Sequence, residues 1–328
     1  MKKLALVMLL MLVASSVYAL EIKIAAVAPE GSTWINVLKE WDADLKKQTA
    51  GRVSLKIYPG GVAGDEKDVI RKMRIGQLHA GGFTGVGLGS INPNVRILEL
   101  PMFFNNYDEV DYVVPKIQGD IEKGFLAKGY VLLGWAEAGF VNIFSNSPIA
   151  SEKDMQGMKM WAWEGDPLVE SLYSAFKIVP VPLSITDVMT SLQTKMINAV
   201  YAPPLGAIAM QWFAKTKYIT DLNLVDSTGA VLMSKSAFDQ LSAADQAILK
   251  STAHIYCKKL IERTRKENKE SLATLQSSGL VLVAVKPADK AQIAKASEGV
   301  WQSLVGQLYP QSLLDKAKTA LAEYRSSH

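Results

Sequence analysis

The sequence has few of the residues from which metal, redox and nucleophilic sites are usually built. Its 328 residues include one cysteine, Cys257, and three histidines. A single cysteine cannot form an intrachain disulfide, and no HExxH motif or paired His/Cys spacing is present. The phosphate-binding motif GxxxxGKS/T and the GxSxG nucleophile elbow are also missing. We therefore expect no metal site built from these ligands, no cofactor and no enzymatic activity.

Strong charge bias and long apolar runs are missing as well. Two N-terminal lysines precede an apolar run over residues 4–13, which is too short to span a bilayer. Small residues ending at Ala19 follow, so we predict a cleaved signal peptide over residues 1–19 and a soluble chain in the periplasm. Without the two leader lysines, 34 of the 36 basic residues remain against 32 acidic ones. This near-neutral balance indicates neither nucleic-acid binding nor direct membrane insertion.

Strands and helices are predicted to alternate from the start of the remaining chain. Residues 21–27, 53–58 and 78–83 have strand patterns, and helical patterns over 34–47 and 66–75 separate them. This order is typical of a parallel sheet covered by helices, and the alternation resumes in the second half of the chain. About 309 residues exceed the usual size of one hydrophobic core. We predict an α/β protein with two lobes.

The longest helical pattern covers residues 242–275 and contains neither proline nor glycine. At 1.5 Å per residue it would extend over about 50 Å, which is more than one lobe needs. We therefore expect one long helix to brace both lobes.

Two tryptophans, Trp161 and Trp163, lie two positions apart on a predicted strand and should project from the same face. Tryptophan is well buried on average, so both could belong to the core. The turn at 164–166 follows directly, however, and ligands of open α/β sheets collect where strands end. Four further residues near predicted strand ends could likewise belong to the core, to ordinary loops or to a site, namely Trp135, Glu137, Phe140 and Tyr201.

A glycine-rich segment follows the third predicted strand. Gly85, Gly87 and Gly89 have the spacing GxGxG rather than GxGxxG, and Pro93 argues against a helix starting immediately after the strand. We expect the backbone here to approach a packed neighbour or a ligand closely, not a nucleotide.

Several motifs along nearly the whole chain after the leader resemble those of one protein family. The motifs are IYPGG at 57–61, GDE at 64–66, LELPMFF at 98–104, SEKDMQGMK at 151–159, PLSITDV at 182–188 and SLQT at 191–194. In these segments the chain is similar to the DctP-type solute-binding proteins of tripartite ATP-independent periplasmic (TRAP) transporters.

This resemblance implies a two-lobed periplasmic-binding-protein fold (type II-like), with crossing hinge strands and the long helix, that closes on a small-molecule ligand. Domain I would hold residues 20–139 plus 231–275, and domain II residues 140–230 plus 276–328. The implied partners are the small and large membrane subunits of a TRAP permease. A ligand-sensing receptor for a signalling partner would have the same binding module, so that alternative stays open.

Three positions depart from the pattern of the family. Trp161 and Val141 stand where members that bind acids usually carry arginines, and Pro203 stands where they often carry asparagine. A carboxylate buried without a cationic partner would lose favourable contacts. We therefore expect an apolar or aromatic ligand, with Glu137 or Glu164 available to anchor an amine or hydroxyl, or alternatively a small organic acid bound without arginine. The candidate ligand contacts are Trp34, Gly85, Trp135, Glu137, Phe140, Val141, Trp161, Trp163, Glu164, Ile185, Tyr201 and Pro203.

Overall fold

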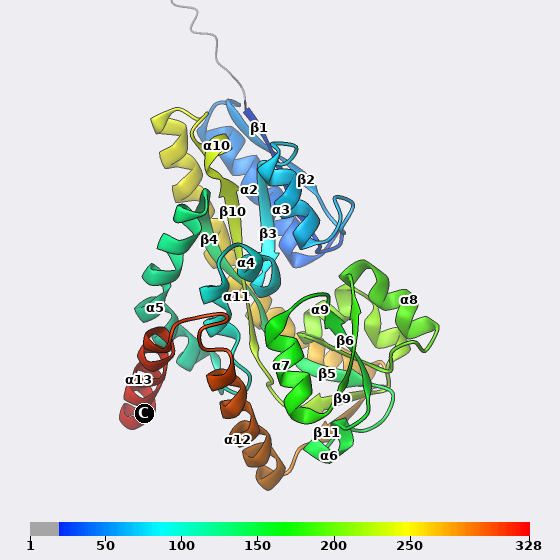
Figure 1. Ribbon diagram of the computed structural model, residues 1–328. Helices are drawn as coiled ribbons and strands as arrows, with labels where there is room; N and C mark the ends of the chain where they lie inside the picture. Colours follow the sequence, from blue (N-terminus) through cyan, green and yellow to red (C-terminus); the bar gives the residue numbers. More distant parts are fainter. Residues whose placement is uncertain (1–19) are drawn as a thin grey trace, which may run out of the picture.

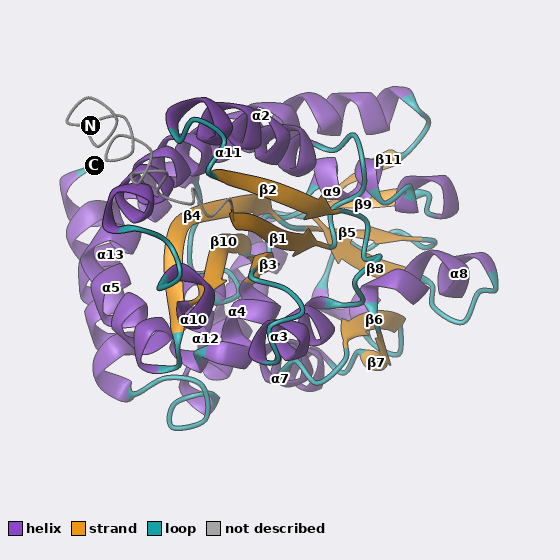
Figure 2. Ribbon diagram, turned by 90° about the horizontal axis from the view of Figure 1, so that it is seen from above, coloured by secondary structure: helices purple, strands orange, loops and turns teal. Residues whose placement is uncertain are grey.

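The computed structural model describes residues 20–328, which form two β-sheets with helices packed on them (Figures 1 and 2). The predicted signal peptide, residues 1–19, lies outside the described residues. Each sheet and its helices form one lobe, and this arrangement confirms the predicted two-lobed α/β fold.

The sheet of the first lobe has the strand order β2-β1-β3-β10-β4. Its strands are β1 (Leu20–Ala26), β2 (Val53–Tyr58), β3 (Ala80–Thr84), β4 (Tyr130–Phe140) and β10 (Asp226–Ser234). Its helical segments are α2 (Thr33–Gln48), α3 (Glu66–Arg74), α4 (Gly85–Ile91), η1 (Pro93–Glu99), α5 (Tyr107–Ala127) and α10 (Lys235–Phe238). The first three strands are parallel, as the β-α-β-α-β pattern predicts, and β10 runs antiparallel between β3 and β4. Figure 2 shows α2 on one face of this sheet and α3 and α4 on the other.

The sheet of the second lobe has the strand order β11-β9-β5-β8-β6-β7. Its strands are β5 (Asn142–Ser145), β6 (Lys159–Trp163), β7 (Val179–Leu183), β8 (Ala199–Ala202), β9 (Tyr218–Asp221) and β11 (Val281–Ala284). Its helical segments are α6 (Glu152–Met155), α7 (Pro167–Phe176), η2 (Ile185–Asp187), α8 (Val188–Gln193), α9 (Pro204–Ala209), η3 (Trp212–Lys215) and α12 (Pro287–Ser303). Asp166 caps α7 by accepting from the backbone N–H of Leu168, and Pro167 takes the first helical position.

Two chain segments cross between the lobes side by side. The first passes from β4 to β5 through Val141, and the second passes from β9 to β10. The backbone of Val141 donates to the Val225 carbonyl and accepts from the Leu224 N–H, each at 2.9 Å. These bonds join the two crossings into one hinge.

The long helix α11 (Ala243–Ser277) packs on α2 and β4 of the first lobe and on α9 of the second (Figure 1). Ser242 caps its N-terminus by accepting from the Asp245 N–H. Near the hinge, the Asn268 side chain donates to the carbonyl of Ala138 and accepts from the N–H of Leu205, both at 2.9 Å. One amide therefore connects a hinge strand with the second lobe, and α11 braces both lobes as predicted.

The last helices return toward the first lobe. Helix α12 packs on α7, whereas α13 (Gln311–Ser327) packs on α5, where Arg325 pairs with Glu109.

The predicted domain boundary at 230/231 falls inside β10. We therefore propose that the first lobe takes β10 as a whole, together with α13.

Candidate functional site

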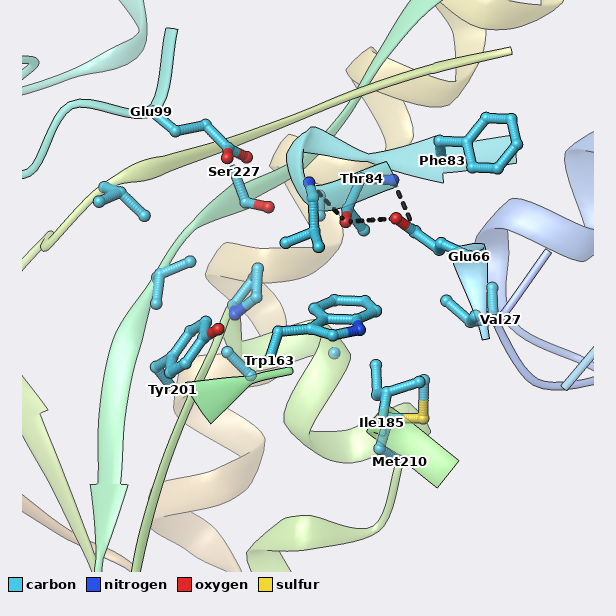
Figure 3. A pocket seen from close by; sticks show the side chains of 18 of the residues that line it. Val27, Glu66, Phe83, Thr84, Glu99, Trp163, Ile185, Tyr201, Met210 and Ser227 are labelled. Atoms are coloured by element: carbon cyan, nitrogen blue, oxygen red, sulfur yellow. Dashed lines mark hydrogen bonds between the residues drawn. The ribbon is translucent and has the colours of Figure 1, made fainter. Parts of the chain in front are cut away.

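A cavity of about 190 Å³ lies between the lobes at the ends of several strands. The first lobe contributes side chains from β3, α3 and η1, and the second contributes side chains from β6, α7, β8 and α9. Figure 3 shows this cavity, with Thr84 and Glu66 on one side and Trp163, Tyr201 and Ile185 on the other.

Aromatic rings form most of the wall that the second lobe contributes. The indoles of Trp161 and Trp163 lie 5.5 Å apart between ring centroids, on the same face of β6. The ring of Tyr201 stacks on Trp161 at 4.7 Å with an interplanar angle of 17°, and Trp212 meets Trp161 edge-on at 5.1 Å. Trp161 is only 1% exposed, so it is both a core residue and a wall of the cavity. The sequence allowed Trp161 and Trp163 to be either core residues or walls of a site, and these two interpretations do not exclude each other.

The polar part of the wall centres on a buried arginine. Arg96 of η1 pairs with Glu99 and with Asp166 of the opposite lobe, and its Nη2 lies 2.8 Å from an Asp166 oxygen. All three residues are at most 5% exposed. The sequence interpretation did not include Arg96, although a charged residue within the apolar run VRILEL is a usable signal, since arginine is rarely fully buried unless it is paired.

Glu66, the first residue of α3, is also buried on the cavity wall. Its carboxyl group accepts from the backbone N–H groups of Thr84 and Gly87 at 2.7 and 2.6 Å, and from the Thr84 hydroxyl (Figure 3). Burial raises the pKa of Glu66 to about 8, because desolvation disfavours its charged form.

The glycine-rich segment forms a helix, contrary to the expectation from Pro93. Thr84 caps α4, which starts at Gly85 and ends at Ile91, so the proline only limits its length. A Cβ atom added at Gly85 would collide with the Glu99 carboxyl group, and one at Gly89 would come within 2.7 Å of the Arg96 side chain. The backbone at these glycines therefore approaches packed acidic and basic side chains closely, as expected for a packed neighbour.

A seam of hydrogen bonds joins the lobes beside the cavity. The Asp65 carboxylate of the first lobe accepts from Trp163 Nε1 at 3.0 Å, from the Ser184 hydroxyl at 2.8 Å and from the Ile185 N–H at 3.2 Å. Asp65 also caps α3, which fixes its position on the first lobe. One carboxylate thus holds three donors of the opposite lobe.

Seven of the twelve sequence candidates line the cavity. They are Trp34, Val141, Trp161, Trp163, Ile185, Tyr201 and Pro203. Trp161, Val141 and Pro203, the three positions at which the sequence resemblance predicts a departure from the family pattern, are all on the wall.

The structure places the other five candidates off the wall, each with a different environment. The carboxylate of Glu137 pairs with Arg265 of α11, and Trp135 donates to Glu122 of α5. Phe140 packs on Tyr107 with ring centroids 4.8 Å apart, Gly85 packs against Glu99, and Glu164 is exposed in the turn beyond β6.

Within residues 20–328, no three His, Cys, Asp or Glu side chains are grouped so that they could hold a metal ion. No helix in this range is both long and apolar enough to cross a bilayer.

Comparison with known proteins identifies the family. Residues 24–307 match the DctP family, described as bacterial extracellular solute-binding protein, family 7. The chain belongs to this family. Its members are solute-binding proteins of transport systems rather than enzymes. A solute-binding protein of Roseobacter denitrificans is 28% identical over 307 residues, which are 91% of this chain and 92% of the relative.

Solved structures of other solute-binding proteins share the fold. A TRAP periplasmic solute-binding protein from Ralstonia eutropha with bound (S)-2-acetolactate has a TM-score of 0.87 at 22% identity. A sugar acid binding protein from Advenella mimigardefordensis with bound galactonate has a TM-score of 0.86 at 21% identity. Both superpositions cover 92% of this chain and 99% of the other.

Proposed function

We propose that this chain is a periplasmic receptor of a TRAP transporter. It captures a small, largely apolar or aromatic molecule between its lobes and delivers it to the small and large membrane subunits of the permease. The family match supports the receptor role, and the names of the structural relatives support the TRAP assignment and the location. The ligand class rests on the cavity itself.

One observation carries the ligand class. Val141, Trp161 and Pro203 stand on the cavity wall at the positions where the resemblance leads us to expect two arginines and an asparagine. Apolar surface therefore replaces three polar anchors, and flat indole faces favour a ring that stacks on them.

The charges on the wall support an uncharged ligand. Among the described residues that line the cavity, Arg96 is the single basic one, and it faces the acids Glu66, Glu99 and Asp166. Glu99 and Asp166 already pair with the guanidinium. A ligand carboxylate would add a further negative charge in a buried site, which costs free energy.

The size of the cavity agrees with a single ring. A cavity of roughly 150 Å³ lined by apolar side chains binds benzene. At about 190 Å³, this one has room for an aromatic ring with a small substituent.

A small organic acid is the second candidate, because galactonate and acetolactate occupy the two relatives and because Arg96 lies on the wall. Calorimetric titration of protein freed of copurified solute would decide between the two. We expect heat of binding from monocyclic aromatic compounds and none from galactonate, acetolactate or succinate. The reverse result would establish the second candidate.

Neighbouring permease genes would support transport, whereas a neighbouring sensor kinase gene would support a sensing role.

A further inference from the structure

Four buried hydrogen-bond donors on the cavity wall have no partner among the described residues. They are the hydroxyl groups of Ser32, Tyr201 and Thr264 and Nε of Arg96. The backbone of Trp163 lies near the Tyr201 hydroxyl but outside hydrogen-bond geometry. Buried polar groups are almost always paired, so an unpaired hydroxyl on a ligand cavity points to an acceptor supplied by the ligand.

The Tyr201 hydroxyl is held in place and directed into the cavity. The tyrosine ring stacks on Trp161, and β8 pairs with β5 on one side and β6 on the other. Figure 3 shows the hydroxyl turned toward the space between Trp163 and Ser227. A ring fixed in this way cannot rotate to find another partner without breaking its stacking contact.

The neighbouring charges select the kind of acceptor. Arg96 is already paired through its two terminal nitrogens with Glu99 and Asp166, so two carboxylates balance its positive charge and only its Nε–H is left unpaired. A neutral oxygen needs only a donor, which Tyr201 provides.

We propose that Tyr201 determines specificity by donating its hydroxyl hydrogen to a single neutral oxygen on an otherwise apolar, ring-shaped ligand. Phenols, aryl ketones and aryl ethers have this chemistry. The inference rests on the proposed function and narrows its ligand class.

The test compares phenol with toluene, which has a methyl group in place of the hydroxyl, in wild-type protein and in Tyr201→Phe. The variant keeps the stacked ring and removes only the hydroxyl. We expect the ratio of the two dissociation constants to shift toward toluene by about tenfold in Tyr201→Phe, with toluene affinity unchanged. Tyr309→Phe is the matched control, because the buried Tyr309 hydroxyl donates to the Trp301 carbonyl away from the cavity. It should leave the ratio unchanged.

An unchanged ratio in Tyr201→Phe would overturn the role of Tyr201 while leaving the proposed aromatic ligand in place. Benzoate provides the test of charge, and binding of benzoate at pH 8 as tight as that of phenol would overturn the neutral oxygen. If phenol, toluene and benzoate all fail to bind wild-type protein, the proposed ligand class is wrong and this inference falls with it.

Discussion

Substitution of Asp65 by asparagine should weaken closure of the lobes without disturbing either lobe. Asparagine caps a helix about as well as aspartate, so α3 should keep its N-terminal cap. The cross-lobe bonds from Trp163, Ser184 and Ile185 would lose their charged acceptor. Asparagine also has one acceptor oxygen instead of two, and its amide group would face donors.

The magnitude follows from the three bonds. Hydrogen bonds to charged groups contribute about 1.5–3 kcal/mol, against about 0.5–1.5 kcal/mol for neutral pairs. A loss of about 1 kcal/mol for each bond gives roughly 3 kcal/mol, or close to a hundredfold decrease in the ratio of closed to open protein.

Spin labels on Ile75→Cys and Met196→Cys would report the distance between the lobes. These side chains are 65% and 53% exposed, whereas Cys257 is buried and should remain unlabelled. Distance distributions recorded by electron resonance as the copurifying solute is titrated give the closed fraction. Asp68→Asn is the control, since Asp68 completes the capping box of α3 without contacting the second lobe. Trp163→Phe should reproduce part of the Asp65→Asn effect, and the two changes should not be additive. An unchanged closed fraction in Asp65→Asn would refute the reasoning.

Three further substitutions test the cavity wall. Trp161→Ala should weaken binding of the native solute more than tenfold. Because Trp161 also belongs to the core, the change should lower the free energy of unfolding by about 3–5 kcal/mol. Unchanged affinity in a titration would show that Trp161 is not part of the binding site. Trp161→Arg should give measurable binding of at least one small organic acid, and failure across a panel would leave the substitution argument without support. Glu66→Gln should flatten part of the pH dependence of stability measured by urea unfolding. Because the pKa of Glu66 is raised, its stabilising effect is complete below about pH 4.5 and is lost as the pH rises through about 8. An equal pH dependence in the wild-type protein and in Glu66→Gln would contradict the burial of the Glu66 carboxyl group.

Local patterns predicted the features that depend on neighbouring residues. The two-residue spacing of Trp161 and Trp163 correctly predicted a shared face, and the helical pattern over 242–275 predicted α11 almost to its ends. Both rest on the periodicity of regular backbone, which the sequence carries directly.

Features that depend on the meeting of distant segments were not predictable in the same way. Arg96 and Asp166 are 70 positions apart, and their pairing requires both lobes to be in place. Glu137 lies near a strand end, as a ligand contact would, but it pairs with Arg265 on α11, a partner 128 positions away. Periodicity indicates a face of a strand and not what packs against that face.

Native mass spectrometry of the protein isolated from its own periplasm tests the central claim most directly. The complex should release a neutral molecule with one aromatic ring and one oxygen-bearing substituent. Release of a sugar acid or a dicarboxylate would contradict the account of an apolar cavity closed over an uncharged ring.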